Sequence, residues 1–144
     1  MRKRHLVKAH LAIATVAILL IPGAAEADAT HFDLICRGKS SFGSLSKLLD
    51  PRTTSEFTAH YRVDLAGKKW CMGDCISTSD LAEVSERLIV FHRHEDKDGD
   101  EFAFVNRESG HYTYRLRSWL LDMVTLNDGS CTPAPFSGMP TRKF

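Results

Sequence analysis

The sequence lacks a second long hydrophobic run, a basic surplus in its main part and any complete catalytic motif. The first 27 residues hold four of the 19 lysines and arginines but one of the 18 acids, so residues 28–144 carry a net charge of −2. Nucleic-acid binding depends on clustered basic charge, and we expect no such partner. Neither a Gly-x-Ser-x-Gly elbow nor a phosphate-binding loop is present, which removes two common enzyme classes.

The single long apolar run lies near the N-terminus and has the order of a secretory signal peptide. Residues 1–10 are basic, residues 11–21 are almost wholly aliphatic, and Ala25-Glu26-Ala27 offers a small-residue cleavage site. The run is roughly half of the ~20 residues that a spanning helix needs, and an uncleaved anchor is the alternative. We expect residues 1–27 to be removed and residues 28–144 to form a single periplasmic or secreted domain without a stable membrane anchor.

Four cysteines, Cys36, Cys71, Cys75 and Cys131, follow this segment. An even number in a small exported domain predicts two disulfides, for which three pairings exist. We favour Cys71–Cys75, where Gly73 lets the backbone turn, with Cys36–Cys131, which joins the first strand to the last. A zinc site with the four cysteines as ligands is the alternative, but one close pair and two distant cysteines match such a site poorly.

Alternation of apolar and polar residues dominates the chain. Residues 56–65 alternate at every position, which predicts a strand with one buried face. Further strands are predicted at 32–37, 69–71, 88–95, 101–107, 111–117 and 123–126, with turns at 66–68, 96–100, 108–110 and 127–129. Residues 44–49 and 80–87 each allow a short helix, and the prolines of residues 132–144 predict surface coil.

These elements predict an all-β fold, a small antiparallel meander of about six strands that forms a barrel or a half-open sandwich with two disulfides. The 117 residues from Asp28 to Phe144 suffice for one domain with its own core.

His92 and His94 are the candidate chemical residues. They lie two apart on a predicted strand and therefore point the same way, together with Leu88 and Val90. Either imidazole could act as a base beside a carboxylate, or both could bind a metal. The alternative is that His92 lies at the edge of the core.

A metal site at these histidines would need a third ligand, for which His60 and His111 are candidates. The acidic segment 96–100 resembles a calcium loop but lacks the first and last carboxylates of that motif, so we interpret it as a hairpin turn. We expect no resident metal or cofactor.

Four aromatic residues, Trp70, Tyr112, Tyr114 and Trp119, either build the core or line a ligand-binding face. We favour the core, because a small β domain builds its core from aromatic side chains.

Several short segments together resemble a family of small, uncharacterised exported bacterial β-domain proteins. The segments are Phe32-Asp33-Leu34-Ile35-Cys36, Tyr61-Arg62-Val63-Asp64-Leu65, Trp70-Cys71 with Cys75, Asn106-Arg107-Glu108-Ser109-Gly110 and Cys131-Thr132-Pro133-Ala134-Pro135-Phe136. The resemblance implies a shared disulfide-linked β domain and no activity. A looser likeness to periplasmic inhibitors of c-type lysozyme concerns shape alone, since their inhibitory loop has no counterpart in this chain.

The sequence therefore predicts a monomeric, non-catalytic binding or inhibitor-like module of the cell envelope. Its partner is an envelope protein or a small ligand. An envelope enzyme or a metal-binding protein that uses His92 and His94 is the alternative.

Overall fold

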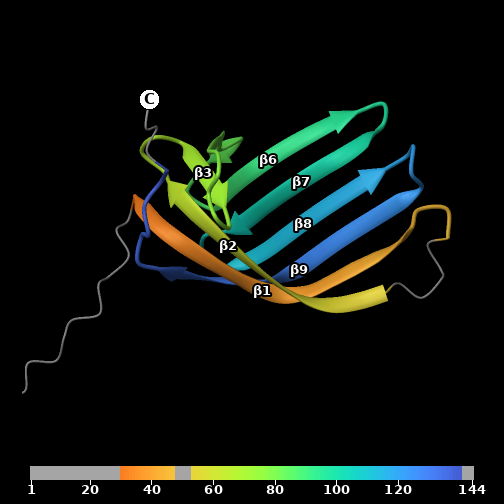
Figure 1. Cartoon of the computed structure of the whole chain (residues 1–144), viewed down its shortest axis with the longest axis horizontal. Helices are drawn as coiled ribbons and strands as arrows, with labels where there is room; N and C mark the ends of the chain where they lie inside the picture. Colours follow the sequence, from red (N-terminus) through yellow and green to blue (C-terminus); the bar gives the residue numbers. More distant parts are fainter. Residues whose placement is uncertain (1–29, 48–52, 141–144) are drawn as a thin grey trace, which may run out of the picture.

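The computed structural model describes residues 30–47 and 53–140, which form one antiparallel sheet and contain no helix (Figure 1). The predicted signal segment, residues 1–27, lies outside the described residues. The prediction of an all-β, disulfide-linked fold is confirmed, with nine strands because three short ones join the six long ones. The strands are β1 (His31–Ser44), β2 (Thr53–Asp64), β3 (Lys69–Met72), β4 (Ser79–Asp80), β5 (Glu83–Val84), β6 (Leu88–Asp96), β7 (Gly99–Asn106), β8 (His111–Ser118) and β9 (Met123–Ala134).

The sheet is a meander in which the first and last long strands lie side by side. Its strand order is β4-β3-β2-β1-β9-β8-β7-β6-β5, and neighbouring strands run antiparallel. β1 pairs along most of its length with both β2 and β9. It therefore joins the N-terminal part of the sheet to the C-terminal hairpins.

The sheet curls until its two edges meet at one end. The short segment from Ser79 to Val84 bridges these edges: the amide of Leu81 donates to the carbonyl of Lys68 at 2.9 Å, and the amide of Ala82 donates to the carbonyl of Val90 at 2.9 Å. At the other end the β6–β7 hairpin diverges from β2 (Figure 1), whereas β9 stays paired with β1 as far as Ser44 and Met123. The result is a half-barrel, closed at one end and open at the other.

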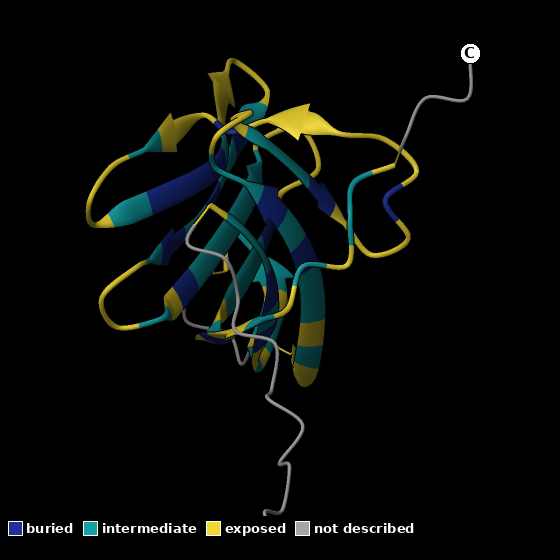
Figure 2. Cartoon of the chain, turned by 90° about the vertical axis from the view of Figure 1, so that its left-hand side faces the viewer, coloured by how far each residue is buried: buried dark blue, intermediate teal, exposed yellow. Residues whose placement is uncertain are grey.

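The concave side of the curl, called the inner face here, holds most of the core. The buried stretches lie within the curl, whereas the hairpin ends are exposed (Figure 2). The core cluster consists of Leu34, Cys36, Tyr61, Val63, Leu81, Ile89, Phe91, Ala103, Val105, Tyr112 and Cys131. Burial of this apolar set stabilises the curl at about 25 cal/mol per Å² removed from water.

The junction of β1 and β9 depends on residues that permit a close approach of the two strands. Cys36 and Cys131 face each other across the ladder with their Cα atoms 3.9 Å apart and form a disulfide. Two residues along, Gly38 faces Gly129, and a Cβ on Gly129 would lie 2.1 Å from the carbonyl oxygen of Arg37. No side chain fits there, so glycine at this position lets the backbones of β1 and β9 approach each other closely.

The turn predicted at residues 127–129 is therefore wrong, because these residues lie inside β9. Tyr112 on β8 faces Gly129, and Phe57 on β2 faces Gly38, with the two rings 5.7 Å apart. The aromatic rings fill the space above the paired glycines. From the sequence alone Asn-Asp-Gly is interpreted as a turn, because these residues are typical of turns. Here the same residues adopt a strand conformation within β9.

Part of the predicted C-terminal coil is also strand. Residues 132–134 belong to β9, and Pro133 pairs with Leu34 of β1. The ladder between β8 and β9 ends at Ser130, so β9 is an edge on that side beyond this point. Proline is tolerated there because its missing N–H faces no partner strand.

The short helix considered at residues 80–87 is wrong. Glu83 and Val84 pair with Val90 and Ile89, and the side chain of Ser85 accepts a hydrogen bond from the amide of Leu88 at 3.0 Å in the following turn. Of the other helical candidate, residues 44–49, the described part is the end of β1 and a turn.

The second disulfide joins Cys71 to Cys75, so the favoured pairing of all four cysteines is confirmed. The loop between them turns through Gly73, with φ of 59°, and Cys75, with φ of 53°. Within the described residues no helix is long and apolar enough to cross a membrane.

The two disulfides differ in the length of chain that they close, 95 residues against four. We expect the Cys36→Ala/Cys131→Ala variant to lose about 4–5 kcal/mol of unfolding free energy and the Cys71→Ala/Cys75→Ala variant about 2 kcal/mol, on the chain-entropy relation. All four cysteines are buried, which makes the pairs matched controls for lost packing. Chemical denaturation measures both values, and equal losses would contradict the expectation.

Candidate functional site

A β-bulge in β6 sets which side chains enter the inner face. Val90 pairs with Phe104 and His92 with Ala103, so Phe91 is an extra residue on this strand. The bulge places both Phe91 and His92 on the inner side. The prediction that Leu88 and Val90 share the face of His92 is therefore wrong, since the extra residue shifts the alternation by one.

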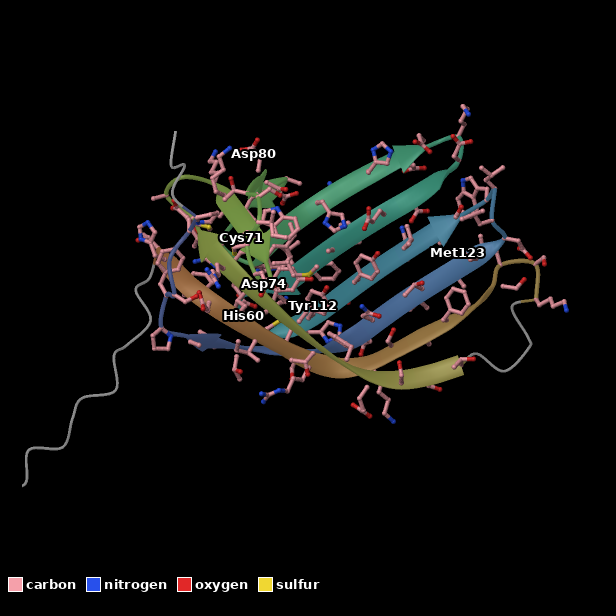
Figure 3. The ribbon with its side chains drawn as sticks, viewed as in Figure 1. His60, Cys71, Asp74, Asp80, Tyr112 and Met123 are labelled. Carbon is pink, nitrogen blue, oxygen red and sulfur yellow. A yellow bond between two sulfur atoms is a disulfide. The ribbon has the colours of Figure 1, made fainter. Side chains whose placement is uncertain are left out.

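A cleft of about 610 Å³ opens on the inner face near the closed end of the half-barrel. Tyr112, one of the residues that line it, lies inside the curl (Figure 3). Six aromatic side chains line the cleft: Phe57, Tyr61, Trp70, Phe91, Tyr112 and Tyr114. Its other lining residues are Thr58, Ala59, Met72, Ser79, Asp80, His92, Glu101 and Asn127. The volume lies in the range of small-molecule sites, which are mostly apolar with a few polar groups.

The floor of the cleft is a pair of buried tyrosines. The hydroxyls of Tyr61 and Tyr112 lie 2.6 Å apart and share one hydrogen bond. Burial raises the pKa of Tyr61, partly offset by this hydrogen bond, and burial also raises the pKa of Tyr112. Both phenols therefore remain neutral. Tyr61 also stacks on Phe91, with ring centroids 4.3 Å apart, which ties β2 to β6 across the curl.

One wall of the cleft combines an imidazole, a carboxylate and a phenol. The hydroxyl of Tyr114 donates to Oε1 of Glu101 at 3.1 Å, and Nε2 of His92 lies 3.2 Å from the same oxygen. Burial, followed by the charge of Glu101, raises the pKa of Tyr114, so the phenol keeps its proton and Glu101 is the acceptor. Trp70 stacks beside the His92 ring at 5.9 Å.

Two polar atoms of this wall are buried without a hydrogen-bond partner among the described residues. They are Nε2 of His92, which is close to Glu101 but poorly aligned with it, and Oδ1 of Asn127. Buried polar atoms are almost always paired in folded proteins. Both residues line the cleft, so a ligand placed there would meet unsatisfied groups.

His94 lies apart from the cluster of His92, Glu101 and Tyr114. It lies on the same face as His92 but nearer the hairpin end, where its Nε2 contacts Oδ2 of Asp96 at 2.9 Å. The two other candidate ligands are also occupied, His60 by Asp33 and His111 by an acidic residue of β9. Among residues 30–47 and 53–140, no three His, Cys, Asp or Glu side chains come together as metal ligands.

Of the four aromatic residues named from the sequence, three line the cleft and one does not. Trp70, Tyr112 and Tyr114 belong to the lining, and Tyr112 is also part of the core. Trp119 lies in the turn after β8, where the guanidinium of Arg117 covers its ring at 4.9 Å. Sequence reasoning missed Glu101 as a cleft residue, because the alternation in β7 favours Phe102 and Phe104 as the inward-facing side chains. In the structure Glu101 instead shares the inner face with Ala103 and Val105 of the core.

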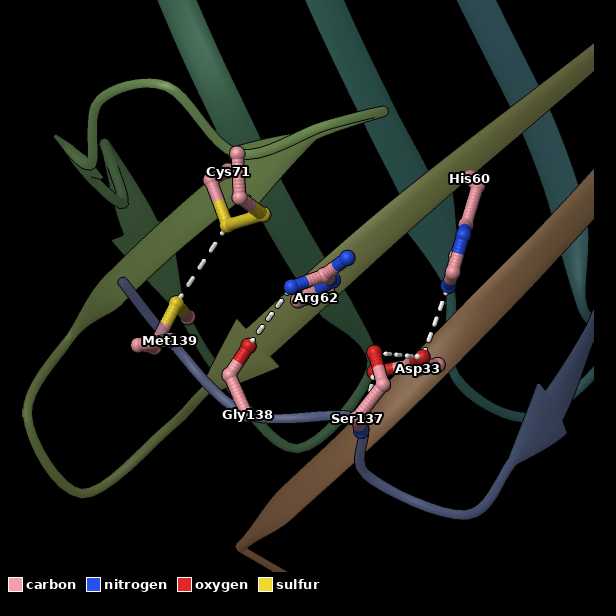
Figure 4. The surroundings of a disulfide bond; sticks show 8 residues. Asp33, His60, Arg62, Cys71, Ser137, Gly138 and Met139 are labelled. Carbon is pink, nitrogen blue, oxygen red and sulfur yellow. Dashed lines mark hydrogen bonds and ion pairs between the residues drawn. A yellow bond between two sulfur atoms is a disulfide. The ribbon is translucent and has the colours of Figure 1, made fainter. Parts of the chain in front are cut away.

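A second polar cluster lies on the outer face, under the C-terminal tail (Figure 4). Asp33 is 3% exposed; its Oδ2 accepts from the hydroxyl of Ser137 at 2.6 Å and lies 2.7 Å from Nε2 of His60. Nearby, Arg62 donates to the carbonyl of Gly138 at 3.1 Å. These contacts hold the tail against β1 and β2.

The residue types of this cluster match a hydrolytic triad, but their connections do not. Ser137 and His60 both bind Oδ2 of Asp33, and no hydrogen bond joins them to each other among the described residues, so the imidazole does not activate the hydroxyl. Burial alone would raise the pKa of Asp33, but hydrogen bonds from Ser137 and His60 outweigh it and hold the pKa below its usual value. The cluster is a structural tie for the tail.

Comparison with known proteins adds no relative. The sequence matches no protein-family model and no curated protein, and the structure matches no solved structure.

The tie at Asp33 predicts a pH-dependent loss of stability. Because its pKa is lower in the folded state, its contribution is present above its ordinary pKa, near 4, and is lost as the pH falls through the folded value. We expect Asp33→Asn to lower the unfolding free energy by about 2 kcal/mol at pH 7, and the difference from wild type to shrink below pH 4.

Denaturant titrations between pH 3 and 7 measure this difference. Asp98→Asn, at the exposed tip of the β6–β7 hairpin, is the matched control and should leave stability unchanged. A gap between wild type and Asp33→Asn that stays constant with pH would show that the charge of Asp33 is unimportant.

Proposed function

We propose that this protein is an exported, monomeric, non-catalytic binding module whose inner cleft takes a small ligand. The observation that carries the proposal is the cleft itself, with six aromatic side chains and two buried polar atoms that make no hydrogen bond among the described residues. Aromatic faces supply contact area at low entropic cost, and the polar atoms supply orientation. A small ligand fits a concave site of this kind better than a protein surface does.

The two disulfides support an extracytoplasmic location, and a periplasmic or secreted protein with a cleaved leader agrees with them. A binding role is also compatible with the resemblance to small exported β-domain proteins, which we keep as part of the proposal. In the inhibitor-like alternative, the partner is an envelope protein and the cleft has no role in binding.

An apolar fluorescent probe tests the cleft. The protein has two tryptophans, and Trp119→Phe makes Trp70 the only one. We expect the neutral probe N-phenyl-1-naphthylamine to bind this variant at one saturable site and to quench Trp70. Adding Tyr114→Ala should weaken binding by about tenfold, because the ring forms part of the wall.

Phe42→Ala is the matched control for that experiment, since Phe42 is 51% exposed and lies at the far end of β1, outside the cleft. It should leave the affinity unchanged. Non-saturable binding, or equal affinities for the Tyr114→Ala and Phe42→Ala variants, would refute the binding site.

A second function, an envelope enzyme, is favoured by one observation. Glu101 lies 3.2 Å from Nε2 of His92 inside the cleft, as a carboxylate that orients a general base does. His94 provides an internal comparison because its partner, Asp96, lies at the exposed hairpin end.

If the protein is an esterase of this kind, it hydrolyses 4-nitrophenyl acetate and His92→Ala lowers kcat/KM by about a hundredfold or more, whereas His94→Ala does not. Release of 4-nitrophenol measures the rate. A wild-type rate equal to that of His92→Ala would remove the enzyme alternative for this substrate class.

A further inference from the structure

We propose that the cleft selects a small organic cation, with an ammonium group held at Glu101 and an apolar body packed on the aromatic walls. This inference rests on the proposed function and names the ligand class of the same site. Three features of the cleft carry it: its charge, its aromatic faces and the kind of polar atoms that it presents.

The charge of the cleft is acidic. Among the residues that the structure describes, two carboxylates, Asp80 and Glu101, line the cleft, no lysine or arginine lines it, and His92 is its one basic residue. Asp80 is bound by Nζ of Lys69 at 2.5 Å and points largely into solvent. Glu101 is therefore the carboxylate that faces a ligand.

Glu101 retains capacity to accept hydrogen bonds. Its contacts with Tyr114 and His92 both involve Oε1, and the described residues give Oε2 no hydrogen bond. A carboxylate has about four lone-pair sites, so a charged donor can still bind it. Charge-assisted hydrogen bonds of this type are about twice as strong as neutral ones.

The aromatic residues next to Glu101 present electron-rich faces. Trp70 and Tyr61, on the paired strands β3 and β2, lie side by side with ring centroids 5.7 Å apart, and the hydroxyl of Tyr114 donates to Glu101 directly. Cations are attracted to the faces of tryptophan and tyrosine, and the interaction strengthens as water is excluded. The combination of such rings with one carboxylate suits an ammonium group with an apolar substituent.

The side-chain oxygen of Asn127 is a second acceptor in the cleft that a donor on the ligand could bind. Asn127 pairs with Tyr114 across the β8–β9 ladder, and its Oδ1 is buried without a partner among the described residues. Acceptors thus lie on two sides of the Tyr114 ring, Glu101 from β7 and Asn127 from β9. An ammonium group carries donors and no acceptor, whereas an anionic ligand would place its oxygens against both of these acceptors.

Isothermal titration calorimetry at pH 7 with three ligands of one shape tests the selection. The probes are 2-phenylethylammonium, the neutral 2-phenylethanol and the anionic 3-phenylpropanoate. We expect the cation to bind about tenfold or more tightly than the alcohol, and the anion to give no measurable binding. Added salt should lower the affinity for the cation and leave the affinity for the alcohol unchanged.

Glu101→Gln keeps the side-chain shape and the acceptor for Tyr114 but removes the charge. It should reduce the affinity for the cation about tenfold without changing that for the alcohol. Glu95→Gln, on the other face of the same hairpin, is the control and should change neither. The salt dependence of wild-type binding provides the same information if Glu101→Gln proves unstable.

The outcomes separate this inference from the proposed function. Equal binding of the alcohol or the anion would overturn cation selection while the cleft remains a binding site. Binding of N-phenyl-1-naphthylamine without binding of 2-phenylethylammonium would do the same. Failure of every probe to bind would overturn both.

Discussion

The pairing of β1 with β9 is the constraint on which the rest of the structure depends. Cys36 and Cys131 join these strands covalently, and Gly38 and Gly129 let their backbones pack closely beside the disulfide. The two sides of the cleft come from opposite sides of this junction. Trp70 and Tyr61 belong to the N-terminal strands, whereas Glu101 and Tyr114 belong to the C-terminal hairpins. Without the junction there would be two smaller sheets and no enclosed face.

The tyrosine pair shows that core and site are the same side chains in this fold. Tyr61 and Tyr112 are almost fully buried, yet their rings and hydroxyls form the floor of the cleft. A small half-barrel has too little interior to separate a packed core from the walls of a cleft. Tyr112 is therefore a core residue, as the sequence predicts, and at the same time a lining residue of the cleft.

Local features of the fold could be predicted from the sequence, because their causes are local. The strand of residues 56–65 follows from strict alternation, and the turn at residues 96–100 follows from an aspartate that accepts two backbone amides. The Cys71–Cys75 disulfide could be inferred because Gly73 suits a tight loop. These predictions need only the nearest neighbours in the chain.

Features that depend on distant residues could not be predicted in this way. The bulge at Phe91 leaves no mark in the pattern, since four apolar residues in a row, Leu88–Phe91, fit either phase of alternation. Gly129 is interpreted as a turn residue until Gly38 is placed opposite it. The contact of His92 with Glu101 required both the bulge and the register of β7, which sequence periodicity does not fix.

The position of β9 at the centre of the sheet has a consequence for how the chain acquires its structure. β1 is made first, but one of its two partners is the last strand to be synthesised. Until the residues up to Ala134 are available, one side of this 14-residue strand exposes unpaired amides and carbonyls. The domain cannot fold progressively from its N-terminus, and a nascent chain must remain protected from edge-to-edge association until almost all of it has emerged.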